Sequence, residues 1–292
     1  MAYETKVLLE GLTFPEGPRW HDNRLWFSDI NDHKIIAVDM DGGAEIVVEV
    51  PEKSSGLGWL PDGRLLLVSV DDNKLKRLDS DGLTEIADLN PLGASYSNDM
   101  VVDSYGRAYI GYTGYDFGTQ SFVYASIIMV TPEGDAKVVA TNMALPNGTV
   151  VTPDGHTLIV AETMDSCLTA FDIQPDGALT NRRIWAQLSE GPVPKPTTLT
   201  ELIELGQTYV LPDGICLDAE GAIWVANPFG REVIRVIEGG QVTDRVRLSA
   251  VVTACMLGGS ERRTLFITIP RGADTEGRIE MVEVEVPGAG LP

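Results

Sequence analysis

The segment LPDGICLDAEGAIWV, from Leu211 to Val225, contains two turn signals separated by a short apolar run. The second signal, DAEG, ends at Gly221 and leads directly into another apolar run. Glycine accepts the positive φ that tight turns require, so the two runs are predicted to be short antiparallel strands joined at DAEG. Asp213 lies about eight residues before Gly221 and therefore stands at the start of the first strand.

The same arrangement recurs along the chain. A step of about eight residues back from the turn glycines Gly63, Gly106, Gly155 and Gly221 reaches Ser55, Asn98, Asn147 and Asp213. The first copy has the turn DNR in place of glycine, and the same step back from Arg24 reaches Glu16. A sixth, degenerate copy begins near Ala254. The starts are roughly 40 to 50 residues apart, with one longer interval of about 66 before Asp213.

A period near forty with several short strands per unit is typical of a β-propeller. We therefore predict an all-β, six-bladed β-propeller with a central channel, formed by a single domain over residues 1–292. The N-terminal stretch KVLLEGLTF is expected to add an outer strand to the last blade and close the ring, which removes exposed sheet edges. A short helix is predicted between Pro196 and Leu205. A pair of β-sandwiches or a jelly roll is the alternative, and the regular period argues against both.

The tetrapeptide LPDG occurs twice, and its position within the repeat gives the two aspartates different roles. Asp62 immediately precedes the turn glycine Gly63 and is expected to be a solvated hairpin residue. Asp213 stands ahead of its own turn, where the strands that line the channel begin. We expect these strand starts to converge at one mouth of the channel.

Four strand starts carry an oxygen-bearing side chain in matching phase. They are FPEG, YSND, LPNG and LPDG, which contribute Glu16, Asn98, Asn147 and Asp213. Two carboxylates and two amides suit a hard cation, and a cation would relieve the repulsion between the carboxylates. Caps on individual strand ends are the alternative, but the matched phase favours a shared site. We expect one divalent cation, calcium in the first place, with manganese, zinc or magnesium as alternatives.

Composition limits the partners. The net charge of −21 and the pI of about 4.4 argue against nucleic acid and anionic membranes. No signal-peptide pattern and no apolar run long enough to span a bilayer is visible. Cys167, Cys216 and Cys255 are widely spaced in apolar surroundings and are expected to be buried thiols of a cytoplasmic protein. We expect a small-molecule substrate and a monomer or small homo-oligomer.

Several motifs occur together in one order: FPEGPRW, SND, LPNG, NRRIWAQL, PDGICLDAEGAIWVA and the ending GG followed by TLFIT. In these motifs, from about residue 7 to 286, the chain resembles the senescence-marker-protein/regucalcin/gluconolactonase/luciferin-regenerating-enzyme family. The resemblance implies a six-bladed propeller with one divalent metal at the channel mouth, usually hydrolysing a lactone. By motif match it implies Glu16, Asn147 and Asp213 as metal ligands. It also implies Asp213 as the general base and Asn98 as a residue near the metal that contacts ligand or substrate.

The chain departs from the family beside the SND motif. Members acting on sugar lactones commonly carry arginine two residues before this asparagine, where this chain has Tyr96. Tyrosine offers one hydroxyl and an aromatic face, which indicates a less polar lactone than a plain aldonolactone. Asp116 matches the family's acidic position, and Tyr112 and Tyr115 beside it are predicted to line the pocket, with blade-core packing as the alternative. The excursions 114–126 and 189–209 are expected to be loops over the mouth.

These observations predict a divalent-metal-dependent lactone hydrolase in which the carboxylate of Asp213 activates water against a polarised carbonyl. No GxSxG elbow is present and the three histidines lie in polar turns, so no serine nucleophile is expected. Hydrolysis of another ester, a phosphotriester or an activated C–C bond at the same site is the first alternative. A non-catalytic metal-binding or scaffold propeller is the second.

Overall fold

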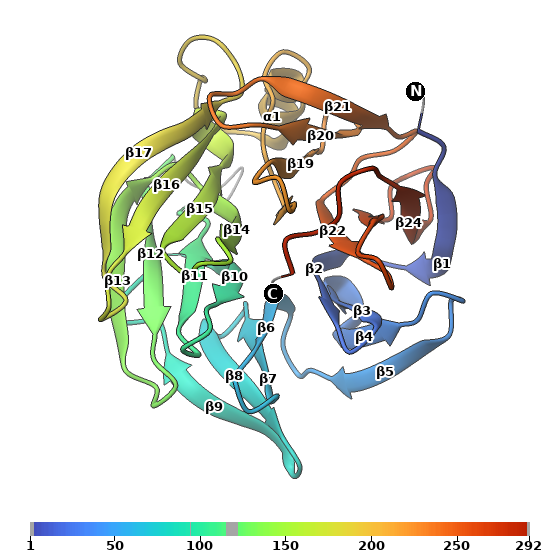
Figure 1. The fold of residues 1–292 in the computed structure, drawn as a ribbon. Coiled ribbons are helices and arrows are strands. Elements are labelled where there is room, and N and C mark those ends of the chain that lie inside the picture. The colour runs from blue at the N-terminus through green and yellow to red at the C-terminus, as the bar shows by residue number, and fades with distance from the viewer. Residues whose placement is uncertain (1–2, 94, 115–121, 291–292) are drawn as a thin grey trace.

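A computed structural model describes residues 3–93, 95–114 and 122–290 of the chain. Six four-stranded antiparallel sheets stand as blades around a central channel (Figure 1). In five of the blades the strand that comes first in the chain lies innermost and the fourth lies at the rim, and in the remaining blade the rim strand comes from the N-terminal end of the chain. The predicted six-bladed propeller is therefore confirmed.

The first three blades follow one another along the chain without interruption. Blade 1 contains β2 (Pro15–His21), β3 (Arg24–Asp29), β4 (Lys34–Val38) and β5 (Ala44–Glu49), with the 3-10 turn η1 (Ile30–Asp32) between β3 and β4. Blade 2 contains β6 (Ser54–Trp59), β7 (Leu65–Ser69), β8 (Lys74–Asp79) and β9 (Gly82–Asp88). Blade 3 contains β10 (Ser97–Val102), β11 (Ala108–Tyr112), β12 (Ala125–Val130) and β13 (Ala136–Met143).

The second half repeats the plan with one insertion. Blade 4 contains β14 (Pro146–Val151), β15 (Thr157–Glu162), the 3-10 turn η2 (Thr163–Asp165), β16 (Cys167–Ile173) and β17 (Leu179–Gln187). Blade 5 contains β18 (Ile215–Leu217), β19 (Ile223–Asn227), β20 (Glu232–Val236) and β21 (Val242–Arg247). Blade 6 contains β22 (Ala254–Gly258), β23 (Thr264–Ile269), β24 (Gly277–Glu283) and, from the other end of the chain, β1 (Lys6–Leu12).

Blade 6 closes the ring with strands from both ends of the chain. β1 pairs antiparallel with β24, from Lys6 opposite Met281 to Leu12 opposite Gly277, as the sequence predicted. The segment after β24 then crosses to blade 5, where the Ala289 N–H donates to the Leu217 carbonyl at 3.0 Å. Figure 1 shows this segment approaching the centre of the ring. Two separate links therefore join the end of the chain to the rest of the propeller.

The core lies between the blades, where large side chains from neighbouring sheets pack together. Trp20 of blade 1 stacks on Phe266 of blade 6, with ring centroids 5.4 Å apart. Trp224, Tyr109 and Phe27 are fully buried in comparable positions. Such rings bury large apolar areas, so the packing between neighbouring blades is hydrophobic.

Glycines bring the innermost strands into direct backbone contact around the channel. A Cβ placed on Gly56 would lie 2.4 Å from the backbone nitrogen of Met100, and one on Gly148 would lie 2.4 Å from that of Ile215. A Cβ on Gly17 would lie 2.8 Å from the Ser55 carbonyl oxygen, and one on Gly214 would lie 2.6 Å from the Cα of Ala254. No side chain fits at these contacts without moving backbone, which explains the glycine after Glu16, Asn147 and Asp213.

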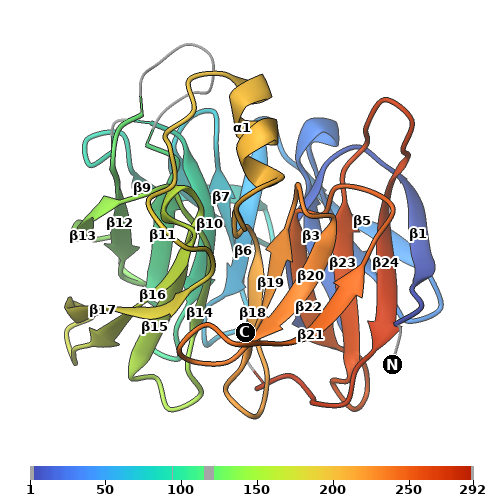
Figure 2. The ribbon, with the colours of Figure 1, turned by 90° about the horizontal axis from the view of Figure 1, so that it is seen from above.

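The long excursion between blades 4 and 5 carries the predicted short helix, α1 (Leu199–Gly206). The Thr198 hydroxyl accepts from the Glu201 backbone N–H, and the Glu201 carboxylate accepts from the Thr197 N–H, so the helix begins at a capping box. Figure 2 shows α1 projecting from one face of the propeller. Because the chain runs from α1 into β18, this is the face on which the innermost strands begin.

The turn prediction for the other LPDG is also confirmed. Asp62 is exposed, and its carboxylate accepts from the backbone N–H and the guanidinium of Arg64.

Across the described residues, no helix has the length and apolar character needed to cross a membrane.

Candidate metal centre at the channel mouth

Irregular pairing marks the start of the innermost strand in four blades. The regular register breaks between Glu16 and Arg19 in β2, and at the matching point in β6, β10 and β14. A bulge of this kind twists a strand and changes the direction of a side chain, and bulges are common beside active sites. Glu16, Asn98 and Asn147 lie in these irregular stretches, and Asp213 directly precedes β18.

Hydrogen bonds link these strand starts from blade to blade. The Ser55 hydroxyl donates to Asn98 Oδ1 at 3.4 Å, and Asn98 Nδ2 donates to Asn147 Oδ1 at 3.3 Å. The Asn147 side chain is in turn hydrogen-bonded to the carboxyl of Asp213. Asn98, Asn147 and Asp213, three of the four residues singled out in the sequence, therefore meet at the mouth of the channel.

Glu16 completes the ring on the side of blades 1 and 6. Its carboxylate accepts from the Gly17 N–H at 3.0 Å and is hydrogen-bonded to the Thr253 side chain just before β22. Each of the six blades thus contributes one oxygen-bearing side chain to the mouth. In chain order they are Glu16, Ser55, Asn98, Asn147, Asp213 and Thr253.

Burial disfavours the charged form of both carboxyls of the ring. Burial raises the pKa of Glu16 to about 7, against the lowering effect of the Gly17 N–H. Burial and the negative charge of Glu16 raise the pKa of Asp213 well above its usual range. A positive charge beside both groups would favour their ionisation at neutral pH.

A divalent cation suits this arrangement of donors. All the side chains of the ring offer oxygen, which is the ligand type that calcium and magnesium prefer. Within the described residues, no group of three or more His, Cys, Asp or Glu side chains could hold a metal. A metal at this mouth would therefore depend on two carboxylates supplemented by amide oxygens, with Glu16, Asn147 and Asp213 as the ligands expected from the sequence.

An ion pair that the sequence reasoning missed lies beside the ring. Arg19 is 4% exposed, and its Nη2 donates to Asp99 Oδ1 at 2.8 Å. Both residues stand inside motifs already singled out, FPEGPRW and SND, and both lie in strands that are mostly buried. Their place inside these two motifs was the available signal. The repeat count also reached Ser55, but a serine side chain alone gave no reason to select this position.

The aromatic residues of blade 3 are placed differently from one another. Tyr96 is 43% exposed, and its carbonyl accepts from the Thr113 N–H. Tyr112 is 1% exposed, and its hydroxyl donates to the Leu89 carbonyl at 3.1 Å. Tyr112 therefore belongs to the blade core, which corrects its prediction as a pocket residue. Tyr115 and Asp116 lie outside the described residues.

An apolar cluster lies under α1, next to the ring. It consists of the buried residues Ala144, Leu145, Met164, Val193, Leu202 and Leu211, with Phe122, Leu205, Tyr209 and Phe229 packed against them. Leu145 and Leu211 each stand two residues before a residue of the ring, Asn147 and Asp213. The excursion that carries α1 thus packs on the rim of the mouth, on the side of blades 4 and 5.

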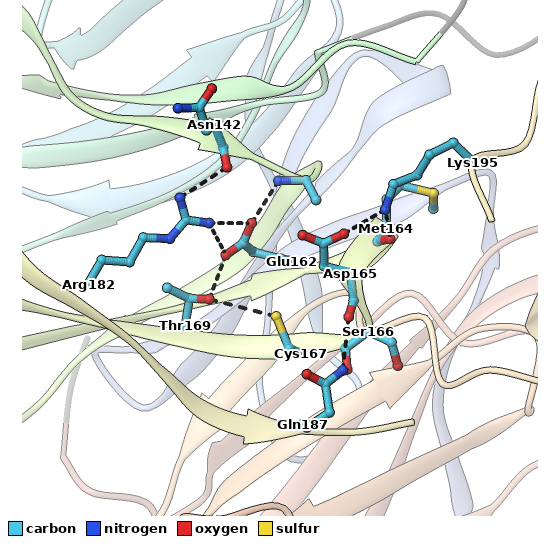
Figure 3. A network of polar contacts seen from close by, with 11 residues as sticks. Asn142, Glu162, Met164, Asp165, Ser166, Cys167, Thr169, Arg182, Gln187 and Lys195 are labelled. Carbon is cyan, nitrogen blue, oxygen red and sulfur yellow. Dashed lines mark hydrogen bonds and ion pairs between the residues drawn. The ribbon is translucent and has the colours of Figure 1, made fainter. Parts of the chain in front are cut away.

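A polar network fixes the same excursion to blade 4 (Figure 3). Lys195 Nζ donates to the Asp165 carboxylate at 2.6 Å and to the Met164 carbonyl. Nearby, Glu162 is 1% exposed and accepts from the Ala144 N–H, the Thr169 hydroxyl and the Arg182 guanidinium. Glu162 has all of its carboxylate oxygens engaged, so it serves as a structural carboxylate.

Comparison with known proteins places this site in a family context. The family model for the SMP-30/Gluconolactonase/LRE-like region matches residues 14–271. The chain is 26% identical over 292 residues to a 6-deoxy-6-sulfogluconolactonase of Pseudomonas putida, covering 95% of this chain and 93% of the relative.

Solved structures share the fold. A luciferin-regenerating enzyme superposes with a TM-score of 0.79 at 19% identity, covering 98% of this chain and 97% of the other. A calcium-binding protein, regucalcin from Agrobacterium tumefaciens str. C58, gives a TM-score of 0.79 at 22% identity, covering 100% and 97%.

Proposed function

The chain belongs to the SMP-30/gluconolactonase/LRE-like family, and on that premise we propose that it is a divalent-metal-dependent hydrolase of a lactone. The observation that carries the proposal is the ring of six side chains at the channel mouth, which includes two carboxyls whose pKa values burial raises and whose charges a cation would neutralise. The lactonase name of the relative from Pseudomonas putida supports the reaction class.

Glu16, Asn147 and Asp213 would hold the cation, and Asn98 lies beside Asn147 at hydrogen-bonding distance. When bound, the cation would neutralise the two carboxylates and polarise a lactone carbonyl. The ionised carboxylate of Asp213 accepts a proton from the attacking water. Water oxygen bonds to the carbonyl carbon, the ring C–O bond breaks, and the proton passes to the departing alkoxide to give the hydroxy acid.

A less polar lactone than a plain aldonolactone suits the surroundings of the ring. Tyr96 offers an exposed aromatic ring and one hydroxyl where an arginine would offer several donors. The apolar cluster under α1 borders the mouth on the side of Asn147 and Asp213. A small-molecule substrate, a cytoplasmic setting and a monomeric or small homo-oligomeric state belong to the same proposal, supported by the net charge of −21 and three buried free cysteines.

The test uses the repeated tetrapeptide as its own control. Asp213→Asn and Asp62→Asn make the same change in two LPDG sequences, and each variant is assayed on gluconolactone, on alkyl- and aryl-substituted lactones, on simple esters and on a phosphotriester. We expect turnover of the substituted lactones with one of Ca²⁺, Mn²⁺, Zn²⁺ or Mg²⁺, a loss of at least about a thousandfold in Asp213→Asn, and no change in Asp62→Asn.

Three results would count against the proposal. Full activity of chelated protein with no metal by elemental analysis would refute metal dependence. Comparable activity of Asp213→Asn would remove the general base. A preference for gluconolactone over the substituted lactones would refute the inference from Tyr96.

A further inference from the structure

The Arg19–Asp99 ion pair has a position that no other buried pair of the described residues shares. Arg19 lies on β2 of blade 1 and Asp99 on β10 of blade 3, so the guanidinium reaches past blade 2 to a carboxylate 80 residues away. The other buried arginine–aspartate pairs, Arg107–Asp103 and Arg235–Asp218, connect residues of a single blade at its hairpin turns.

The pair is joined to three strands that carry ring residues. Asp99 directly follows Asn98 and accepts from the backbone N–H of Met100 at 2.8 Å and from that of Thr149 on β14. Arg19 follows Glu16 by three residues on β2. The pair therefore sits against the strand starts that supply Glu16, Asn98 and Asn147.

Arg19 donates from Nη1 to the Pro18 carbonyl and from Nη2 to Asp99 and to the Met100 carbonyl. Its Nε is buried without a partner, although guanidinium donors in well-built buried pairs are normally satisfied. Arg107 and Arg235 both use Nε in their ion pairs. What Arg19 adds beside the ring is a buried positive charge.

The charges beside the mouth leave a definite balance. Glu16, Asp213 and Asp99 supply three negative charges when ionised, and Arg19 supplies one positive charge. Two negative charges remain, which one divalent cation would neutralise. Removing the positive charge of Arg19 makes the mouth more negative by one unit, and removing the negative charge of Asp99 makes it less negative by one unit.

We propose that Arg19 and Asp99 compensate each other's charge beside the channel mouth, so that the mouth keeps the two negative charges that suit a divalent rather than a trivalent cation. The inference rests on the metal centre of the proposed function and names its specificity-determining residues. Neither residue is required to touch the ion, so both would act on it through their electrostatic field.

The test measures binding of Ca²⁺ and Tb³⁺ by titration calorimetry at one low ionic strength, without any substrate. A unit charge acting across a few side chains at an effective dielectric of about 20 changes affinity by about tenfold per charge on the ion. Arg19→Met should therefore raise the preference for Tb³⁺ over Ca²⁺ by about tenfold. Asp99→Asn should lower it by about tenfold, and the double variant should return to the wild-type ratio.

Arg107→Met is the matched control, since it breaks an equally buried pair far from the ring and should leave the ratio unchanged. If Arg19→Met does not fold, Asp99→Asn should still lower the ratio by about tenfold, and the double variant should restore it. Unchanged ratios in folded variants would overturn the inference while leaving the metal centre intact. Failure of the wild-type protein to bind either ion would instead refute the metal centre, and the inference with it.

Discussion

Replacing Glu16 with glutamine is expected to stabilise the metal-free protein at neutral pH, although it removes a residue of the proposed metal centre. Burial raises the pKa of this carboxyl from 4.5 to about 7 in the folded state. The folded state therefore holds its proton more tightly than the unfolded state. The free energy of unfolding falls as the pH rises from about 4.5 to 7, and the full penalty is present above pH 7.

The size of the effect follows from the shift. A difference between 4.5 and about 7, at roughly 1.36 kcal/mol per unit, gives about 3 kcal/mol. Glu16 is half-buried at an open mouth, so solvent screening lowers this to about 2 kcal/mol. Glutamine keeps an oxygen that can accept from the Gly17 N–H and carries no charge. For a chain of this length, about 2 kcal/mol corresponds to roughly 4 °C in melting temperature.

The assay is urea unfolding in a chelating buffer at pH 5 and pH 8. The Glu16→Gln variant should exceed the wild type by about 2 kcal/mol at pH 8 and by little at pH 5. Saturating Ca²⁺ should reverse the order, because the wild type then gains the binding energy of the ion. Glu10→Gln, at an exposed position on β1, is the control. Equal stability of Glu16→Gln and wild type at both pH values in chelator would refute the electrostatic account of the ring.

Three further predictions test other parts of the structure. Gly148→Ala should destabilise the fold by about 3 kcal/mol in urea unfolding, because its Cβ would meet the Ile215 nitrogen at 2.4 Å, and a neutral result would refute backbone contact there. Lys195→Met should expose residues 189–209 to limited proteolysis with little change in melting temperature, since it removes the ion pair to Asp165; unaltered cleavage would mean that other contacts hold the excursion. Burial raises the pKa of the Cys167 thiol to about 12, so we expect no thiol to react with DTNB at pH 8 until guanidinium is added, and labelling of the native protein would contradict the packing.

The fold was predictable because its signals are local and repeated. A turn glycine between two apolar runs specifies a hairpin in each blade, and the recurrence of that hairpin specifies the ring. Ring closure by β1 followed from the need to cover a free edge in the last blade. The capping box before α1 likewise lies within a few residues of the helix it starts.

The site residues that occupy equivalent positions in the repeat could be predicted from the sequence. Residues that meet only through contacts across the channel could not. Asn98, Asn147 and Asp213 were found because the repeat places them at equivalent points. Tyr112 was misplaced because every residue of β11 is buried, so no polar alternation indicates which side it faces. The Arg19–Asp99 pair joins blades that are not neighbours, a relation that no local pattern encodes.

The glycines behind the ring have a consequence for how such an enzyme can change. Because backbone meets backbone at Gly17, Gly56, Gly148 and Gly214, the width of the mouth does not depend on the side chains that face it. A mutation from asparagine to aspartate, or from serine to glutamate, would alter the chemistry of the opening while its frame stays the same. The side chains of the ring can therefore change in evolution while the glycines behind them must be kept. A new reaction could arise by exchanging one residue of the ring at a time.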